Sequence, residues 1–414
     1  MTLPWKSAGL RFAVLLPACA AVLAYALTCV QVYRASDYAD NGDVAGLQRA
    51  TEIQPGNAAY HCRLGRRLWQ EKQDFHAAIA ELQAGVALNR DDPYCWLQLA
   101  GTAQNAGDEK LRDTALAEAV AADPKTPAVL WEAANFNFVR GETTEALHQL
   151  RLAMQYQDTL LEPGVQLEWR ATRDPGLMLR EGIPPLPTAH LSLLELLIRQ
   201  NDAAGAALVW PALLKLGKPF DPVRGYKYIT YLLDHDYDEQ VRPAWNQLVA
   251  TLPALRGYEA QPDNLIVNAG FERDVLNGGL DWHYDARAGV SASIDPDESH
   301  SGARSLALAF DGAFDDVGVT QRVAVRPNTE YVFSAWFKPD LESVSAPHFV
   351  IWNGAGTIQL LNTSPMMGTP NWRELRGQFT TGDTHTVWLR IRRNEPLSQI
   401  RGHLWIDDLV LRPR

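Results

Sequence analysis

Small residues recur about every 34 residues between Ala58 and Tyr156, and this repeat restricts the fold more than any other feature of the sequence. Equivalent positions are held by Gly65, Ala100 and Ala134, by Gly85, Ala119 and Ala153, and by Gly107 and Gly141. Apolar residues recur around them at helical spacing. Small side chains at repeated positions let paired helices pack closely, so the sequence predicts a stack of helical hairpins.

These positions, together with Leu64 and Leu99 and the Asp123-Pro124 pair that closes a repeat, resemble the tetratricopeptide repeat (TPR) family. The resemblance covers residues 33–156, and its first unit is shortened. It implies a solenoid whose groove binds a protein partner. One departure is Gln73, which stands where the first full repeat should have its turn glycine.

Residues 157–187 break the period. Asp174-Pro175-Gly176 and Pro184-Pro185-Leu186-Pro187 predict that no long helix forms there, so an irregular insertion or cap is expected. Residues 188–258 return to amphipathic helical spacing and are predicted to add further hairpins to the solenoid.

An uncharged apolar run extends from Phe12 to Val30 near the start of the chain. At about 1.5 Å per residue, the run nearly matches a hydrocarbon layer of about 30 Å. Residues 12–32 are therefore predicted to form a single transmembrane helix. The alternatives are a cleaved signal peptide and a lipid-modified Cys19.

The charges around this run predict its orientation. Lys6 and Arg11 precede it, whereas mostly acidic residues follow it, so residues 1–11 are expected on the cytoplasmic side. The rest of the chain would be exported. With an alanine- and arginine-rich composition, this favours the inner membrane of a Gram-negative bacterium, with the bulk of the chain in the periplasm.

Composition excludes several classes of protein. A chain of 414 residues is too long for one core, so two or more domains are expected. A net charge of −11 argues against nucleic-acid binding. The four cysteines lack the paired spacing of a zinc site. Cys62 and Cys95 fall on successive repeats and are expected to be small buried residues, with a disulfide as the alternative.

Near residue 260 the pattern changes from helical spacing to the alternation typical of strands. Short strands separated by Gly, Pro, Asn and Asp are predicted at 305–310, 319–325, 331–338, 348–352, 375–381, 386–393 and 404–411. Strands of this number and length favour a two-sheet sandwich. The predicted fold class is therefore a multidomain α + β protein: a transmembrane helix, an α-helical solenoid and a C-terminal β-sandwich.

Several phrases in residues 263–414 carry a second resemblance. They are Asn264-Leu265-Ile266-Val267-Asn268-Ala269-Gly270-Phe271-Glu272, His300-Ser301-Gly302-Ala303-Arg304-Ser305-Leu306, Asn371-Trp372-Arg373 and Leu404-Trp405-Ile406-Asp407-Asp408-Leu409. Together they resemble carbohydrate-binding module families 4, 9 and 22, which share a galactose-binding-like jelly roll. Such modules usually carry a structural calcium ion, and the matching positions here are Gly270, Glu272 and Asp407. Alternatively, Asp407 simply ends a strand.

Sugars are held by aromatic faces and by polar side chains beside them. In residues 386–392, Val387, Leu389 and Ile391 form an apolar face, so the opposite face is predicted to point outward. The predicted carbohydrate-binding residues are Trp282, Trp336, Trp352, Trp388, Arg390 and Arg392.

The leading hypothesis is a membrane-anchored scaffold that binds a protein through its repeats and a polysaccharide through its C-terminal module, in glycan assembly or export. A second hypothesis is a role in glycosidic-bond hydrolysis. Such an enzyme needs a pair of carboxylates, and Glu162, Glu168, Asp174 and Glu181 lie in the only uncommitted region. No catalytic residues are predicted. A third hypothesis is a TPR adaptor whose β-domain binds nothing.

Overall fold

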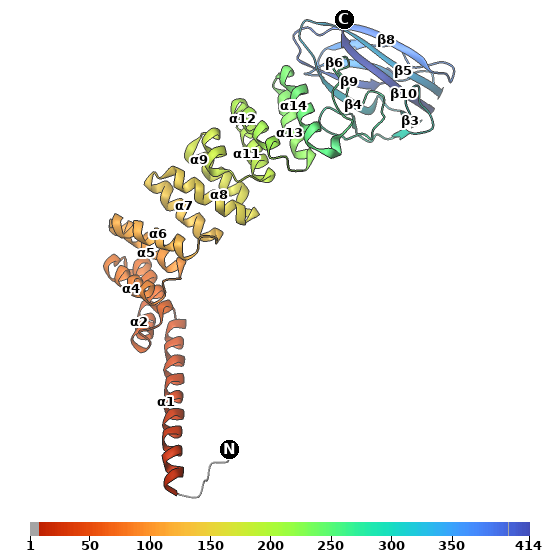
Figure 1. Cartoon of the computed structure of the whole chain (residues 1–414). Helices are drawn as coiled ribbons and strands as arrows, with labels where there is room; N and C mark the ends of the chain where they lie inside the picture. The colour runs from red at the N-terminus through yellow and green to blue at the C-terminus, as the bar shows by residue number, and fades with distance from the viewer. Residues whose placement is uncertain (1–7, 396) are drawn as a thin grey trace. The chain divides into compact units, whose positions relative to one another are not determined.

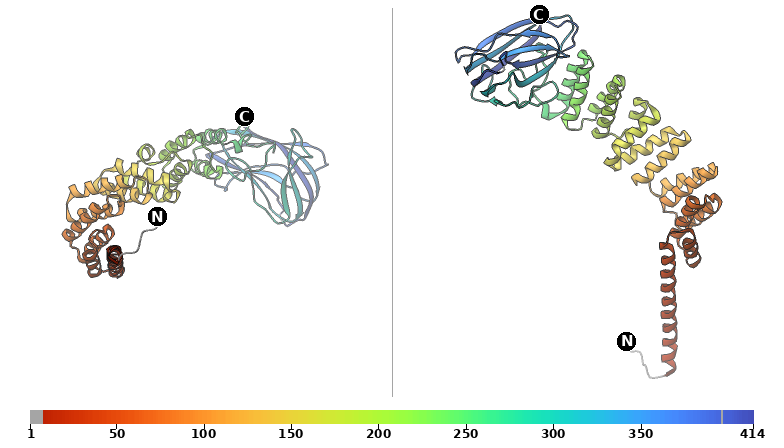
Figure 2. Two further views of the ribbon diagram at one scale, coloured as in Figure 1. Left: turned by 60° about the horizontal axis from the view of Figure 1, so that its bottom comes forward. Right: turned by 180° about the vertical axis from the view of Figure 1, so that it is seen from behind.

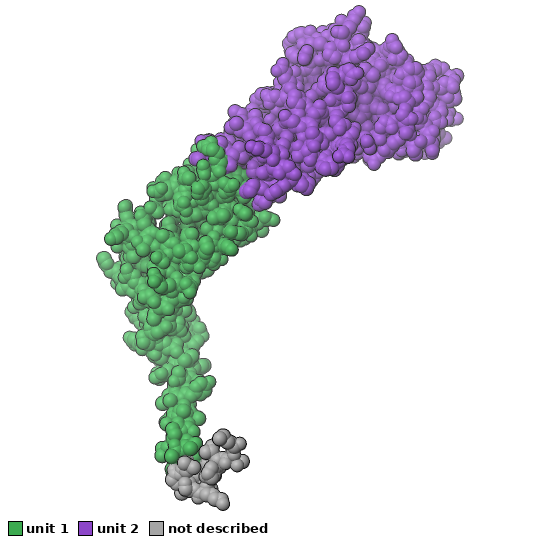
Figure 3. Space-filling model, viewed as in Figure 1, with its two compact units in different colours: residues 1–173, 180–184 green, residues 174–179, 185–414 purple. Residues whose placement is uncertain are grey.

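The computed structural model describes residues 8–395 and 397–414 (Figure 1). Two compact units are distinguished in Figure 3. Unit 1 extends to residue 173 and includes residues 180–184, and unit 2 comprises residues 174–179 and 185–414. Helices are followed by two antiparallel sheets, so the predicted combination of helical hairpins and a C-terminal β-sandwich is confirmed.

The first helix, α1 (Ala8–Asp40), is longer than the predicted segment 12–32. From Phe12 onward it is long and apolar enough to cross a membrane by length and composition, with a mean hydropathy of 2.2. It continues past residue 32 because Ala35 and Ala39 are buried, Ala39 in a cluster with Leu47 of α2 (Val44–Ile53). Of the predicted cytoplasmic segment, residues 1–7, with Lys6, lie outside the described residues.

Paired helices follow at the predicted period, and Figure 2 shows them from two further directions. They are α3 (Ala58–Arg67, continued by the π-helical turn η1, Leu68–Lys72) with α4 (Phe75–Leu88), α5 (Pro93–Ala106) with α6 (Glu109–Ala122), and α7 (Pro127–Arg140) with α8 (Thr143–Tyr156). The repeated small residues lie where paired helices meet. A Cβ atom at Gly65 would lie 2.6 Å from the side chain of Leu82, so a larger residue would force α3 and α4 apart.

The turns between paired helices use the left-handed conformation that glycine adopts without strain. Gly107 and Gly141 end α5 and α7 with φ angles of 76° and 80°. Gln73 adopts the same region at the equivalent turn, with φ of 53°. The first full repeat therefore keeps the geometry of the turn although it lacks the glycine.

Cys62 on α3 and Cys95 on α5 form a disulfide, so the expectation of two unbridged cysteines is wrong. Their Cα atoms lie 5.6 Å apart. The close approach depends on Gly85 of α4, where a Cβ atom would lie 2.5 Å from the Sγ atom of Cys62. A small residue at this repeat position thus lets a covalent bond join successive repeats.

Residues 157–187 contain the regular helix α9 (Leu161–Thr172), so the prediction of an irregular insertion is wrong for this part. Pro163 is accepted because it lies in the first turn, where backbone N–H groups have no partner within the helix. Short turns make up much of the remainder: η2 (Asp158–Leu160), α10 (Pro175–Leu177) and η3 (Met178–Gly182).

Unit 2 continues with two further helical pairs. They are α11 (Pro187–Arg199) with α12 (Ala203–Lys215), and α13 (Pro222–Asp234) with α14 (Asp238–Thr251), which is followed by the turn η4 (Pro253–Leu255). Apolar residues at helical spacing are buried in α11 and α13, as expected for amphipathic helices that pack one face against their neighbours.

Two five-stranded antiparallel sheets form the rest of unit 2. Sheet A has the order β1-β4-β9-β6-β7 and sheet B the order β2-β3-β10-β5-β8. Their bounds are β1 (His283–Tyr284), β2 (Val290–Asp295), β3 (Ser305–Gly312), β4 (Asp316–Ala324), β5 (Glu330–Glu342), β6 (His348–Asn353), β7 (Gln359–Asn362), β8 (Arg373–Thr380), β9 (Thr386–Arg392) and β10 (Ile400–Pro413).

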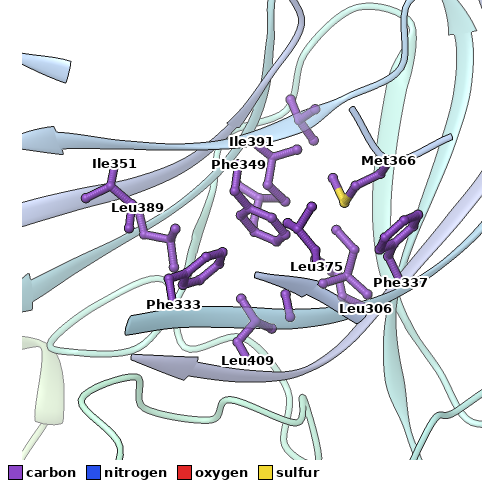
Figure 4. Close-up of a cluster of buried hydrophobic side chains, with 14 of the residues drawn as sticks. Leu306, Phe333, Phe337, Phe349, Ile351, Met366, Leu375, Leu389, Ile391 and Leu409 are labelled. Carbon is purple, nitrogen blue, oxygen red and sulfur yellow. The ribbon is translucent and has the colours of Figure 1, made fainter. Parts of the chain in front are cut away.

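The core of the sandwich lies between these sheets, and Figure 4 shows part of it. Phe349, Ile351 and Leu389 come from sheet A, and Phe333 and Leu306 come from sheet B. Alternate residues of each strand enter this core, so the residues between them must face outward.

The last helical hairpin packs directly on the sandwich within unit 2. The ring of Trp245 on α14 is fully buried against Gly279, whose Cβ atom would lie 2.1 Å from it. Asp234 and Asp238 pair with Arg322 and His385 of the sandwich, both at 2.7 Å. The change from helix to strand near residue 260 therefore does not divide the chain into compact units.

Candidate functional site

Strand β9 presents the predicted polar residues on the outer face of sheet A. Val387, Leu389 and Ile391 are buried in the core, so Trp388, Arg390 and Arg392 extend from the opposite side. All residues of this second set are half-buried rather than covered. The alternation read from the sequence thus places the three side chains on one surface.

Neighbouring strands add to this surface in register. Trp388 lies opposite Arg322 of β4 on one side and Trp352 of β6 on the other. Arg392 lies opposite His348 of β6. We call the set Arg322, His348, Trp352, Trp388, Arg390 and Arg392 the arginine–tryptophan face.

Trp388 lies on β9, the middle strand of sheet A, and is held there by contacts on both sides. Its Nε1 atom donates a hydrogen bond to the carbonyl oxygen of Gly354 at 3.1 Å. The guanidinium groups of Arg322 and Arg390 lie over its ring, each with its central carbon 5.0 Å from the ring centroid. Cation–π contacts therefore fix both arginines, and the indole is not a bare platform.

The face gathers buried polar atoms that have no hydrogen-bond partner among the described residues. They are the Nε atoms of Arg322, Arg390 and Arg392, the Nε1 atom of Trp352 and the Nδ1 atom of His348. Folded proteins pair nearly all such atoms, and each unpaired one costs about 1–3 kcal/mol. Their concentration on one outer surface is typical of a site whose partner is a ligand or ordered water.

Charge on the face is unevenly compensated. Arg322 pairs with Asp234 at 2.7 Å, and Arg392 pairs with Asp315 at 2.7 Å. Arg390, between them, forms no ion pair with any described residue. Burial and, to a lesser extent, the nearby charge of Arg392 lower the pKa of His348 below its ordinary value.

A cavity of about 630 Å³ lies beside this face within unit 2. Residues of α11 and α13, of the loop before β1 and of β1 itself line it, among them Tyr231, Lys227, Asp234 and His283. Asp234 also pairs with Arg322, so the cavity and the face meet at this ion pair. A second cavity of about 700 Å³, beside α14, shares no lining residue with the face.

Two of the predicted sugar-binding residues lie elsewhere. Trp282 is fully buried in the core, where its Nε1 atom donates to the carbonyl oxygen of Asn268, so its prediction as a sugar ligand is wrong. Trp336 belongs to β5 of sheet B. It stacks on His300 with ring centroids 3.8 Å apart and cannot act together with the arginine–tryptophan face.

The sequence prediction missed Arg322 and His348. The signal for Arg322 was present, because Val319 and Val323 of the same strand are buried and Arg322 falls between them. His348 opens β6, and its place beside Arg392 follows only from the pairing of β6 with β9.

The predicted calcium ligands lie close together near the ends of the sandwich. A Cβ atom at Gly270 would lie 3.6 Å from a carboxylate oxygen of Asp407 and 3.9 Å from the side chain of Glu272. Asp407 is fully buried and accepts hydrogen bonds from the backbone N–H groups of His300 and Ser301, at 2.8 and 3.1 Å. Burial raises the pKa of Asp407, and the charge of Asp408 adds to the rise.

This cluster fits a calcium ion only in part. Glu272 accepts from the backbone N–H of Ala303 at 2.9 Å, and Asp408 pairs with His300 at 2.6 Å. Within the described residues, no group of three or more His, Cys, Asp or Glu side chains is arranged to hold a metal ion. A calcium ion here would therefore take backbone oxygens for most of its ligands.

The acidic residues considered for glycosidic-bond hydrolysis lie in different surroundings, and Glu162 accepts a hydrogen bond from Gln166 at 3.3 Å. Glu168 is fully buried, and burial raises its pKa well above the ordinary value. Glu181 pairs with His148 at 2.8 Å, and Asp174 accepts from the backbone N–H of Leu177. These contacts serve the packing of residues 157–187.

Comparisons with known proteins agree with the C-terminal resemblance. Residues 263–396 match the family model described as a carbohydrate binding domain. The chain is also similar to the CBM22-1 xylan-binding domain of Paenibacillus barcinonensis Xyn10C, with 19% identity over 35% of this chain and 91% of that one and a TM-score of 0.26. A CBM4 structure matches with 16% identity over 36% of this chain and 99% of that one, with a TM-score of 0.28.

The helical region has its own structural neighbours. Pseudomonas aeruginosa PilF matches with 17% identity over 48% of this chain and 91% of that one, with a TM-score of 0.26. No curated protein matches the sequence. At TM-scores this low, the fold assignment rests on the helical pairs, the strand order and the family model.

Proposed function

We propose that the arginine–tryptophan face binds a polysaccharide, that the helical repeats bind a protein partner, and that α1 anchors the chain in a membrane. The observation that carries the first part is the cluster of unpaired buried polar atoms on one outer sheet face. This face lies in a region that matches a carbohydrate-binding family model.

Sugar chemistry suits this face. Sugar hydroxyl groups accept hydrogen bonds. The Nε atom of Arg390 and the Nε1 atom of Trp352 are N–H donors that have no acceptor among the described residues. Sugar C–H groups pack on aromatic rings, and Trp352 offers such a ring beside Trp388, whose own ring is covered by Arg322 and Arg390. A chain of several sugars could contact neighbouring strands of sheet A at once.

Exposed apolar residues support a protein partner for the repeats of unit 1. The side chains of Val139, Tyr94 and Tyr156 are 74%, 51% and 48% exposed. Stacked helical pairs offer an extended surface for a partner chain, and exposed apolar side chains favour contact with another protein.

The proposed membrane anchor rests on the exposed apolar surface of α1. Leu16, Val22 and Leu23 are each more than 60% exposed. The basic residues Lys6 and Arg11 before the apolar run favour a cytoplasmic N-terminus and an exported remainder. We place the bulk of the chain in the periplasm of a bacterium, where the two binding surfaces would link a glycan to its assembly or export machinery.

Replacing Trp352 with alanine should weaken glycan binding by about tenfold or more, because the variant loses both an aromatic face and an N–H donor. Full-length protein in detergent would be screened against a glycan array, and isothermal titration calorimetry would measure the affinity for the best ligand. Trp336→Ala is the matched control on the opposite sheet and should retain affinity. Failure of the native protein to bind any glycan, or equal loss in both variants, would contradict the proposal.

We further propose that calcium binds near Asp407 and joins the first and last segments of the sandwich. The buried carboxylate beside Asp408 supports this, because a cation would offset the repulsion between the two. Calcium at about 100 times its Kd should stabilise the folded chain by about 2.7 kcal/mol, measured as a higher unfolding temperature than in chelator. Asp407→Asn should abolish the increment, whereas Asp383→Asn should keep it. Identical unfolding of the native protein with calcium and with chelator would refute this site.

A further inference from the structure

The arginine–tryptophan face places an unpaired cation at its centre. Arg322 pairs with Asp234 on α13, and Arg392 pairs with Asp315 and Asp316 at the start of β4. Arg390 lies opposite Thr320 of β4 and Val350 of β6, neither of which can neutralise it. The compensating charges thus lie around the face and leave its middle positive.

The geometry prepares Arg390 to receive an acceptor. Stacking over Trp388 restrains its guanidinium group, and Trp388 is itself held by the carbonyl oxygen of Gly354. The Nε atom of Arg390 is buried and has no hydrogen-bond partner among the described residues. A restrained and partly desolvated guanidinium loses little entropy when it binds, and its planar donor fork matches a carboxylate.

Neutral sugars would satisfy this arrangement incompletely. A hydroxyl group accepts a hydrogen bond from Arg390 but leaves its charge uncompensated beside Arg322 and Arg392. A carboxylate supplies two acceptor oxygens and a negative charge. Because the whole chain carries a net charge of −11, an acidic polymer would be repelled by most of the protein and drawn to this local positive surface.

We propose that this face selects acidic polysaccharides, with the carboxylate of a uronic acid residue bound by Arg390. This inference rests on the proposed glycan-binding function and names its substrate class. Trp352, which lies opposite Trp388 on the strand beside Arg390, would contact a sugar ring next to the bound carboxylate.

The test compares each acidic glycan with its own neutral form. Polygalacturonate, alginate and glucuronoxylan oligosaccharides would be measured against full-length protein by calorimetry, before and after chemical reduction of their carboxyl groups to alcohols. Reduction preserves the linkages and removes the charge. At least one acidic form should bind about tenfold or more tightly than its reduced form, and added salt should weaken that binding.

Variants assign the preference to Arg390. Arg390→Gln should remove the difference between the acidic and reduced forms, and Arg390→Lys should restore part of it. Arg376→Gln, an arginine on sheet B that pairs with Glu374, should change nothing. Equal affinity for acidic and reduced glycans, or a preference that persists in Arg390→Gln, would overturn the inference and leave glycan binding intact. Absence of binding to any glycan, acidic or neutral, would overturn the proposed function as well.

Discussion

Replacing Trp245 with alanine is expected to lower the free energy of unfolding by about 3–5 kcal/mol. The indole is fully buried, lies 5.9 Å from the ring of Tyr226 and fills the space over Gly279. Its Nε1 atom also donates to the carbonyl oxygen of Tyr258 at 2.7 Å. The substitution would leave a large cavity and a buried acceptor without its donor.

Urea unfolding of the full-length protein, followed by circular dichroism, would measure this loss. Trp372→Ala is a suitable control, because that half-buried ring touches His300 only by its edge, and it should cost about 1 kcal/mol. If the helical signal and the sheet signal of unit 2 separate in Trp245→Ala, the ring is what makes α14 and the sandwich unfold together. A loss below about 1 kcal/mol would contradict the shared core.

The repeats were predictable because their signal is local and repeated. Small residues at a fixed interval specify where helices touch. Gln73 adopts the left-handed turn although it replaces the glycine, so the repeat keeps its backbone geometry there. The disulfide was not predictable in the same way. It depends on the distance between α3 and α5, which is set by Gly85 on the helix between them.

Pro163 shows that a proline does not always prevent a helix. The predicted breaks in residues 157–187 rest on Asp174-Pro175-Gly176 and Pro184-Pro185-Leu186-Pro187, whereas Pro163 lies in the first turn of α9, where a proline costs little. Only the location of the helix start, at Leu161, distinguishes the two cases. Cues around a proline matter more than the number of prolines.

The candidate site was predictable within a strand but not between strands. Alternation in β9 correctly separates Trp388 and Arg390 from the buried Leu389. It does not reveal that β5 belongs to the other sheet, so the sequence alone does not show that Trp336 lies apart from Trp352 and Trp388. Trp282 lies just before β1, outside any strand, so alternation cannot show whether its side chain faces the core or the surface. The structure buries it in the core, where it cannot contact a sugar.

The free energy of unfolding is expected to fall as the pH rises from about 4 to about 7, because of Asp281. Its side chain is buried, and burial raises its pKa from 3.8 to about 7, although the backbone N–H of Leu276 donates to one carboxylate oxygen. The other oxygen has no partner among the described residues. In this range the unfolded chain releases the proton of Asp281 and the folded chain keeps it.

The sign follows from proton binding. Because the folded state holds more protons than the unfolded state, the free energy of unfolding decreases with rising pH, by at most about 1.4 kcal/mol per pH unit. The decrease from this group totals up to about 4 kcal/mol and ends above its folded pKa. At pH 8 the buried carboxylate of Asp281 would be ionised beside Tyr226 and Tyr258. This is the least favourable charge state for the contact between the last helical hairpin and the sandwich.

Asp281→Asn should remove this dependence, since an amide cannot ionise and its oxygen can still accept from Leu276. Urea unfolding at pH 5 and pH 8 would compare the variant with the native protein. The variant should be the more stable of the two at pH 8 and lose that advantage at pH 5, where the native carboxyl group is protonated. A constant difference between the two proteins at both pH values would show that Asp281 ionises in the folded state as it does in the unfolded chain. In that case its carboxylate must be stabilised by water or a cation inside the interface between α14 and the sandwich.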